Sequence, residues 1–522
     1  MSDFEVYCLV LIAMVLSLVN WRVGVVICLV TGFLQDPLRK LVPGEPIAFT
    51  ALVAAPLGMT LLGARLRRVP LSFKPVHSWS KVLRRPLRWF LILVLIQSFA
   101  AVLRTGTPIV GAIGALSYLA PLPAILIGYY FSRNKKDISK IIVAYLIVAV
   151  AMVLTVYLSY ARYDWAVLRQ VGTGLFIYSM ERGRLTLYAG FLRSPEIAAW
   201  HAATASCLLV LMSIAVKRNA VMKIVAGALA LSMIGAILLT GRRKFLIELL
   251  LFVSLYTLML IWFRKSAIKS AFLSKSALLL VGGLAVGAVA YMYVIPDVTA
   301  TDIRPYYERG ASVRTGVTER FSLMTLSSFQ YVIADNGLLG SGAGTGSQGV
   351  QHFGGQITGL SAEGGLAKVL AELGVPGLAL LIWVVISLAR YIWLILKIPS
   401  EREVDPILSK LILGLVAFLA TNGVVYVIAH QVFGDPFVLI ILGFFLGFVM
   451  ATPKIIQRED IRRGKCEPGQ VFKFPSTLVE RRCNTEGQGR ESQSKNRPRR
   501  NEEPSHHGPG DTFNPVLGRS LP

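Results

Sequence analysis

The sequence predicts an all-α polytopic membrane protein with about 12–13 transmembrane helices. Three observations predict this class. The composition is 54% hydrophobic and only 16% charged, and the mean hydropathy is +0.60. Apolar runs of about 17–25 residues recur along most of the chain, which is the length of helix that crosses a hydrocarbon core. The short loops that alternation assigns to one side are also all basic, as they are in proteins that cross a membrane many times.

The apolar runs place the predicted spans in chain order. The first does not resemble a cleaved signal peptide, because Asp3 and Glu5 stand where such a peptide carries basic residues. The second is short and contains Gly24 and Gly32. The spans are expected near 4–20, 22–36, 47–63, 87–103, 107–131, 138–160, 195–216, 222–240, 245–263, 276–296, 366–396, 408–429 and 435–451.

The distribution of Lys and Arg in the short loops predicts their sides. Residues 64–88 carry many Lys and Arg and no acid, so we expect this loop on the cytoplasmic side. Alternation then puts the basic segments 132–137, 217–219, 264–270 and 397–410 on the same side. The N-terminus and the loops 35–46, 104–106, 161–194, 241–244, 297–365 and 430–434 are expected outside.

Two regions are expected: a membrane domain over 1–451, with a large outer loop at 297–365, and a basic tail over 452–522 that is predicted to be cytoplasmic and disordered. The formal net charge is +25. Because the cations are spread over loops and the tail, they favour contact with lipid headgroups rather than with nucleic acid. The spacing of the five cysteines indicates neither a disulfide framework nor a metal site.

The stretch "LLTGRRKFLIELL" places Arg242, Arg243 and Lys244 outside, against the usual charge bias. One explanation is that these side chains extend to the headgroups while Lys244 pairs with Glu248 one turn later. The other is an anion site, because Arg grips phosphate oxygens through two donors at once. On the outer face of a membrane, the expected phosphate-bearing substrate is a lipid-linked one.

A second polar stretch, "MERGRLTLYAGFLRSPEIAAWHAATA", leads into the span at 195–216. It carries the cations Arg184 and Arg193. Pro195 is suited to the first position of a helix, so Glu196 would lie in the first turn, where its charge suits the helix dipole. His201 is predicted to be a packed helix histidine more readily than a catalyst.

The large loop 297–365 is too long for a simple connection. It holds Arg320, the aromatic pair Tyr306 and Tyr307, and eleven glycines between 337 and 365, Gly342 and Gly344 among them. Such glycines let the backbone approach a ligand or let a lid move, although a flexible loop explains them as well. "GSGAGTGS" lacks the Lys-Ser/Thr ending of a nucleotide-binding P-loop.

His352 and Glu363 are the candidate proton acceptors of this loop. Transfer of a glycosyl group to a sugar hydroxyl calls for a nearby base, and inverting transfer commonly uses one carboxylate. Lys368 and Glu372, farther along, have the spacing of a structural helix pair. The residues leave open which of His352 and Glu363 is the base.

These stretches together resemble the O-antigen ligase and polymerase superfamily of bacterial membrane enzymes, which act on undecaprenyl-diphosphate-linked glycans at the periplasmic face. The similar pieces are Arg184 with "GFLRSPEIAA", then "LLTGRRKFL", then "ERFSLM…NGLLGSGAG", then "AEGGLAKVLAELGVPGL". They follow the family's order over roughly 180–450. Ligases of the family carry His where Glu363 stands, and Pro195-Glu196 replaces their usual Pro-Asn, so the departures favour a polymerase over a ligase.

The resemblance implies a membrane glycosyltransferase that polymerises lipid-linked repeats for capsule, exopolysaccharide or O-antigen, in the inner membrane and without metal or cofactor. Its diphosphate leaving group would be bound by Arg184, Arg193, Arg242, Arg243 and Arg320. Glu363 or His352 would accept the proton, and Gly342, Gly344, Tyr306 and Tyr307 would contact the glycan. Membrane lipid, a chain-length regulator or a flippase are the expected partners.

Two other functions stay open at this point. The same resemblance fits an O-antigen ligase, which transfers the lipid-linked glycan to a final acceptor. A transporter of polysaccharide or of a small molecule is the alternative from another class, and it would place ionisable residues in the middle of its spans. The sequence shows few of these, since the acids and bases gather toward one face.

Overall fold

Almost all regular structure among the described residues is helical, and the described helices belong to one unit. The computed structural model describes residues 2–72, 82–171, 176–179, 183–216, 219–263, 305–306, 328–347, 364–401, 404–428 and 430–463. The chain divides into two units, Met1–Gln470 and Val471–Pro522, and every described helix and strand lies in the first. The first residues of the predicted tail, Thr452–Arg462, form a packed helix rather than a disordered segment. The predicted boundary at 451 and the disorder of the rest of the tail stay predictions.

The described elements follow the predicted spans closely. The helices of the first half are α1 (Asp3–Val19), α2 (Trp21–Leu41), α3 (Ala54–Leu66), α5 (Arg84–Thr105), α6 (Pro108–Leu119), α7 (Pro121–Phe131) and α8 (Lys135–Tyr160). Those of the second half are α9 (Pro195–Ala215), α10 (Ala220–Leu239), α11 (Lys244–Phe263), α16 (Ser328–Asn336), α17 (Gly365–Glu401), α18 (Pro406–Ile428), α19 (Pro436–Met450) and α20 (Thr452–Arg462). Three short 3₁₀ helices connect them: η1 (Ile47–Ala51), η2 (Ala166–Leu168) and η6 (Gln431–Gly434).

Ten helical segments of the described chain are long and apolar enough to cross a membrane, or eleven if α19 and the bent α20 count as one span. The membrane-helix prediction is therefore confirmed at this level. The predicted span at 4–20 is not among the ten because α1 has only 17 residues, the short end of the spanning range. The predicted second span is longer than expected: Asn20 caps α2, which continues to Leu41. The predicted span 276–296 lies outside the described residues.

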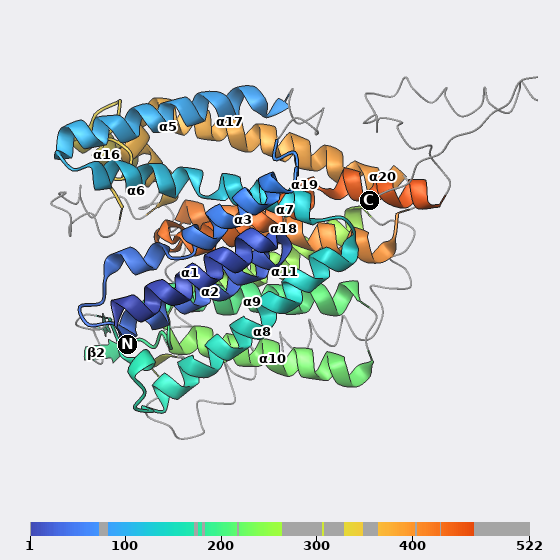
Figure 1. The fold of residues 1–522 in the computed structure, drawn as a ribbon, viewed down its shortest axis with the longest axis horizontal. Coiled ribbons are helices and arrows are strands. Elements are labelled where there is room, and N and C mark those ends of the chain that lie inside the picture. The colour runs from blue at the N-terminus through green and yellow to red at the C-terminus, as the bar shows by residue number, and fades with distance from the viewer. Residues whose placement is uncertain are drawn as a thin grey trace, which may run out of the picture. The chain divides into compact units, whose positions relative to one another are not determined.

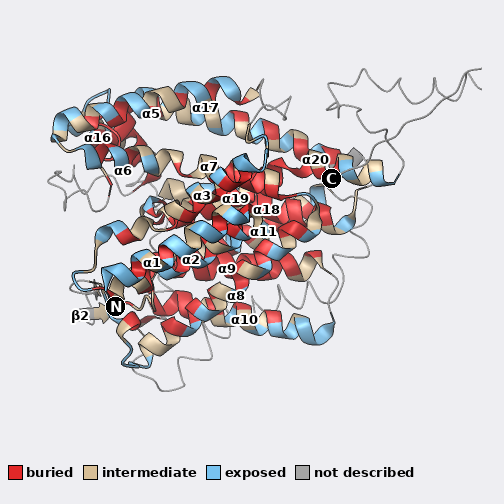
Figure 2. Ribbon diagram, in the orientation of Figure 1, coloured by how far each residue is buried: buried red, intermediate tan, exposed pale blue. Residues whose placement is uncertain are grey.

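Helix α9 is the most deeply buried of the ten candidate spans, with 89% of its apolar window buried, and Figure 2 shows the interior of the bundle as buried. All of its residues except Ser213 and Ile214 are buried. Its first half is rich in alanine, and small side chains let neighbouring helices approach closely. The helices α8, α10, α11 and α18 pack around it. The residues that begin α9 are consequently held from several sides.

The described loops lie at two opposite ends of the bundle (Figure 1), and ion pairs and hydrogen bonds connect the loops within each end. At one end, Lys40 of α2 donates to the carbonyls of Val167 and Leu192. At the other end, Arg22 pairs with Asp137 at 2.9 Å. In the same region Lys135 pairs with Asp405. The described loops predicted to lie outside therefore share the end near Lys40; which compartment that end faces stays a prediction.

The predicted outer loop 161–194 contains regular structure that the all-α prediction did not include. Strands β1 (Phe176–Ser179) and β2 (Gly183–Thr186) pair antiparallel, with Phe176 opposite Thr186 and Tyr178 opposite Arg184. The hairpin is short, and its hydrophobic alternation is too brief to be distinguished from a loop in the sequence.

The glycine-rich segment 338–347 is docked onto the helices. Its backbone donates to Ala371 and Glu372 of α17 and to Gln97 of α5. The Glu372 carboxylate accepts from the Tyr118 hydroxyl at 2.7 Å and from the backbone N–H of residue 346 at 3.1 Å. The predicted pair of Lys368 with Glu372 is present, with 3.9 Å between Nζ and Oε1. This part of the loop is therefore a packed element, held by backbone hydrogen bonds to α5 and α17 and by the buried Glu372 carboxylate.

Substitution of Gly344 should test this docking. Its φ of +98° suits glycine, and a Cβ there would lie 2.2 Å from the Val110 carbonyl oxygen of α6. Gly344→Ala should therefore cost about 1–2 kcal/mol of backbone strain and a further ~1–3 kcal/mol of overpacking. The matched control is Gly337→Ala, which has a φ of +72° but open space around the new Cβ. Thermal unfolding in detergent should show the larger loss for Gly344→Ala, and equal losses would contradict the docked arrangement.

Candidate functional site

A buried ionic junction joins three segments at the end of the bundle near Lys40. Arg193, which precedes α9, donates from Nη1 to Asp36 at 2.9 Å and from Nη2 to Asp435 at 2.5 Å. Its backbone N–H donates to the other oxygen of Asp36 at 3.0 Å. Asp36 belongs to α2, and Asp435 caps the N-terminus of α19 through Phe437 and Val438. Both acids are almost completely buried, at 1% and 2% exposure.

The electrostatics of the junction favour the charged state of Arg193. Burial by itself lowers the pKa of this guanidinium, but Asp36 and Asp435 outweigh it, so the pKa is raised above its ordinary value. Asp36 also interacts electrostatically with Arg39 and Lys40. The charge of Arg193, predicted to bind a diphosphate, is thus already balanced by protein carboxylates in this structure.

Lys40 fixes the neighbouring backbone in place. Its ammonium donates to three carbonyl oxygens, those of Val167 at 3.2 Å, Gly190 at 3.1 Å and Leu192 at 2.9 Å. An ammonium group has three donors, so these bonds use its full capacity. The segment after α8 and the segment before α9 are therefore tied to the same side chain of α2.

Two of the three cations of "GRRK", Arg242 and Lys244, meet the first turn of α9. Lys244 forms an ion pair with Glu196, and Arg242 lies 3.8 Å from the second oxygen of that carboxylate. The Gln431 amide, oriented so that its nitrogen faces the acid, donates to both oxygens at 2.8 and 2.9 Å. Burial lowers the pKa of Arg242. Arg243 lines a small hollow together with Arg242 and Tyr306. Pairing with Glu196 therefore accounts for much of the charge that the sequence places at this end.

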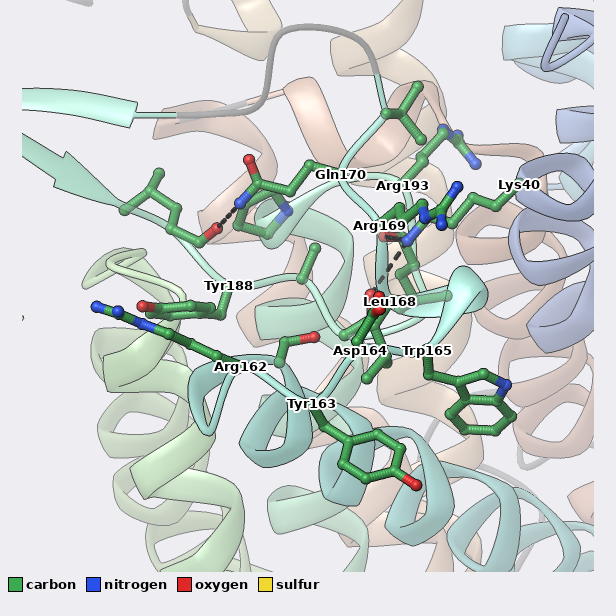
Figure 3. A pocket seen from close by; sticks show the side chains of 17 residues that line it. Lys40, Arg162, Tyr163, Asp164, Trp165, Leu168, Arg169, Gln170, Tyr188 and Arg193 are labelled. Carbon is green, nitrogen blue, oxygen red and sulfur yellow. Dashed lines mark hydrogen bonds between the residues drawn. The ribbon is translucent and has the colours of Figure 1, made fainter.

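A cavity of about 280 Å³ lies between the segment after α8 and the segment before α9. The lining carries four cations and one acid. The cations are Lys40, Arg162, Arg169 and Arg193, and the acid is Asp164. Figure 3 shows Arg162 and Tyr188 on one side of the cavity and Lys40 and Arg193 on the other. Because Lys40 and Arg193 are engaged within the protein, the exposed Arg162 and Arg169 are the lining cations best able to meet an anion.

Arg162 adopts a backbone conformation that usually belongs to glycine. Helix α8 ends in a Schellman motif, which has two backbone hydrogen bonds. The Arg162 N–H donates to the Ser159 carbonyl, and the Tyr163 N–H donates to the Leu158 carbonyl. The left-handed position of this motif is normally glycine, whereas here it is Arg162, with a φ of 55°. A non-glycine residue there costs about 1–2 kcal/mol. Such strain at the edge of a cavity is typical of a residue selected for its side chain.

Aromatic side chains surround the same cavity. Tyr163 and Trp165 are 61% and 49% exposed, as expected for aromatic side chains at the headgroup level of a membrane. The Tyr188 ring lies 5.5 Å from Tyr160 and 6.0 Å from Tyr306, measured between ring centroids. The sequence "YARYDWAVLRQ" does show this mixture of aromatic and basic residues, but the sequence alone does not show that they border a cavity.

The structure places the predicted site residues in several environments. Arg193, Arg242 and Arg243 share one end of the bundle, and the backbone of Arg184 lies in β2. Tyr306 is 5% exposed and donates to the Thr186 carbonyl at 2.5 Å, so its ring has little surface for a sugar. Gly342 and Gly344 pack against α5 and α6. The remaining candidates, Tyr307, Arg320, His352 and Glu363, lie outside the described residues. All the assigned binding and catalytic roles stay predictions.

Among the described residues, no group of three or more His, Cys, Asp or Glu side chains could hold a metal ion. Comparison of the sequence with protein-family models finds no match. Comparison with curated proteins also finds no significant match.

Removal of the central guanidinium should destabilise the protein strongly. Arg193→Ala would leave Asp36 and Asp435 buried without their partner, so we expect a loss of about 3–5 kcal/mol of unfolding free energy. Arg169→Ala, at an exposed position of the same cavity, should change it by less than about 0.5 kcal/mol. Chemical unfolding in detergent measures both variants. Adding Asp36→Asn and Asp435→Asn to Arg193→Ala should recover part of the loss. If Arg193→Ala were as stable as Arg169→Ala, the junction would be contradicted.

Proposed function

We propose that this chain is a membrane glycosyltransferase that polymerises undecaprenyl-diphosphate-linked oligosaccharide repeats at the outer face of a bacterial inner membrane. The observation that carries this proposal is the strained Arg162 beside a basic, aromatic cavity at the end of the bundle predicted to face outside. The resemblance of four ordered sequence stretches to the O-antigen ligase and polymerase superfamily supplies the reaction class.

The cavity suits the head of a lipid-linked glycan. Its volume of about 280 Å³ is close to the lower end of the size of small-molecule sites, about 300–1,000 Å³, and so fits a diphosphate with its first sugar better than a whole repeat. Arg162 and Arg169 would bind the phosphate oxygens, since a guanidinium offers paired donors in a planar fork. Tyr188 would offer a ring to the sugar. Tyr163 and Trp165 would hold this end at the headgroup level.

The chemistry follows from the charge of the leaving group. As the glycosidic bond breaks, negative charge develops on the diphosphate, and fixed cations around it lower the barrier. Loss of one such donor costs about 10²–10³-fold in rate. The acceptor hydroxyl gives its proton to Glu363 or His352, the two bases that the sequence indicates. No metal or nucleotide cofactor has a part in this scheme.

Arg162→Gly is the sharpest test of the proposal. Glycine relieves the left-handed backbone strain, so the variant should be as stable as wild type or more stable by about 1 kcal/mol. The same variant should nevertheless lose polymer in cells, because the guanidinium is gone. The measurement is the polysaccharide profile of cells that carry the variant, with membrane protein levels checked. A wild-type polysaccharide profile in cells that carry Arg162→Gly would show that Arg162 is not part of the site.

Three further variants complete the experiment. Arg169→Ala and Glu363→Gln should also abolish polymer, and single repeats should accumulate on undecaprenyl diphosphate. Lys136→Ala, an exposed cation at the opposite end of α8, is the control and should leave the profile unchanged. Long polymer that stays on the lipid would instead identify a ligase. An unchanged profile in all variants would favour a transporter.

A further inference from the structure

A buried carboxyl group lies inside a predicted span, apart from the cavity described above. Glu248 is one turn into α11 and is 0% exposed. One of its oxygens accepts from the Asn422 amide of α18 at 3.1 Å. The other oxygen has no hydrogen-bond partner among the described residues. A carboxyl group so placed inside a membrane span is by default a functional candidate.

The orientation of Asn422 is fixed by its other neighbour. The Trp200 indole N–H, which can only donate, contacts the Asn422 oxygen at 2.8 Å. The Asn422 nitrogen must then face Glu248, and it also donates to the Phe418 carbonyl at 3.1 Å. Glu248 therefore accepts from a single neutral donor. The Asn422 amide cannot rotate to improve this hydrogen bond without losing its contact with Trp200.

Other polar groups face the same region from α8 and α9. Glu248 has electrostatic interactions with the Tyr145 hydroxyl and the Cys207 thiol. Tyr145 contacts Nδ1 of His201 at 2.8 Å. Nε2 of His201 and the hydroxyl of Ser206 are buried and have no partner among the described residues. Orphaned polar atoms of this kind are the usual ligands of buried water.

Lys244 is the cation nearest to Glu248 along α11. The two are separated by four residues, the spacing of a helical ion pair, and they interact electrostatically. In this structure the Lys244 ammonium is committed to Glu196 of α9. An ionised Glu248 would thus compete with Glu196 for one cation, in a region where an incompletely paired charge costs several kcal/mol.

We propose that Glu248 is a proton-binding site inside the membrane domain, and that Lys244 becomes its counter-charge when the proton leaves. In the step, the O–H bond of the Glu248 carboxyl group breaks, the electron pair stays on the carboxylate, and the proton passes to water. Lys244 then shares its charge between Glu196 and Glu248. This proposal does not depend on the transferase function, because it concerns a resting protein without substrate.

Infrared difference spectroscopy of the full-length protein in lipid vesicles tests this site directly. A protonated carboxylic acid has its own carbonyl band, which should be present at neutral pH and disappear as the pH is raised. Glu248→Gln should remove that band while the amide keeps an oxygen for Asn422. A band that persists unchanged in Glu248→Gln would overturn the proposal, as would its absence from wild type at neutral pH.

Two charge variants test the role of Lys244. Lys244→Gln removes the counter-charge, so the band should survive to a higher pH. Glu196→Gln removes the competitor of Glu248 for Lys244, so the band should disappear at a lower pH. Opposite shifts in these variants support the shared cation, whereas unchanged titrations in both would refute it. Tyr145→Phe is the control for a general disturbance of the region and should keep the band.

Discussion

The arrangement of this end of the bundle depends on the ionic junction of Arg193 with Asp36 and Asp435. The three residues come from distant parts of the chain and bring α2, the start of α9 and the start of α19 to one point. Both acids are buried, so each needs the guanidinium, and the guanidinium needs both to offset its own desolvation. Lys40 then ties the adjoining backbone to the same helix. The cavity exists because these segments are held in place.

Charges at this end have two distinct roles. Arg193, Lys244 and Arg242 face protein carboxylates, which accounts for buried cations at the end of the bundle that is predicted to face outside. Arg162 and Arg169 are exposed beside the cavity, and Arg162 occupies a position where glycine would be less strained. Structural cations are thus distinguished from candidate ligand-binding ones by burial and by partner, which residue type alone does not show.

Two carboxylates of the membrane domain illustrate how far hydrogen bonding decides the behaviour of a buried acid. Glu372 receives a hydroxyl, a backbone N–H and a nearby ammonium, and it thereby holds the glycine-rich segment on α17. Glu248 receives one amide and leaves an oxygen without a partner among the described residues. The contacts of Glu372 suit a structural anchor. Those of Glu248 leave one buried oxygen without a partner among the described residues and suit the exchange of a proton.

The sequence by itself determined that the chain is a helical membrane protein, and it placed most span boundaries within a few residues. Long apolar runs and basic loops are local signals, and the bilayer enforces them. It also indicated the cluster of cations at 242–244 and the pair of Lys368 with Glu372. The tertiary structure decided which acid each cation meets, that the glycines at 342 and 344 pack against helices, and that Arg162 borders a cavity. Those facts depend on contacts between segments that are distant in the sequence and on one backbone torsion. Neither produces a periodic pattern in the sequence.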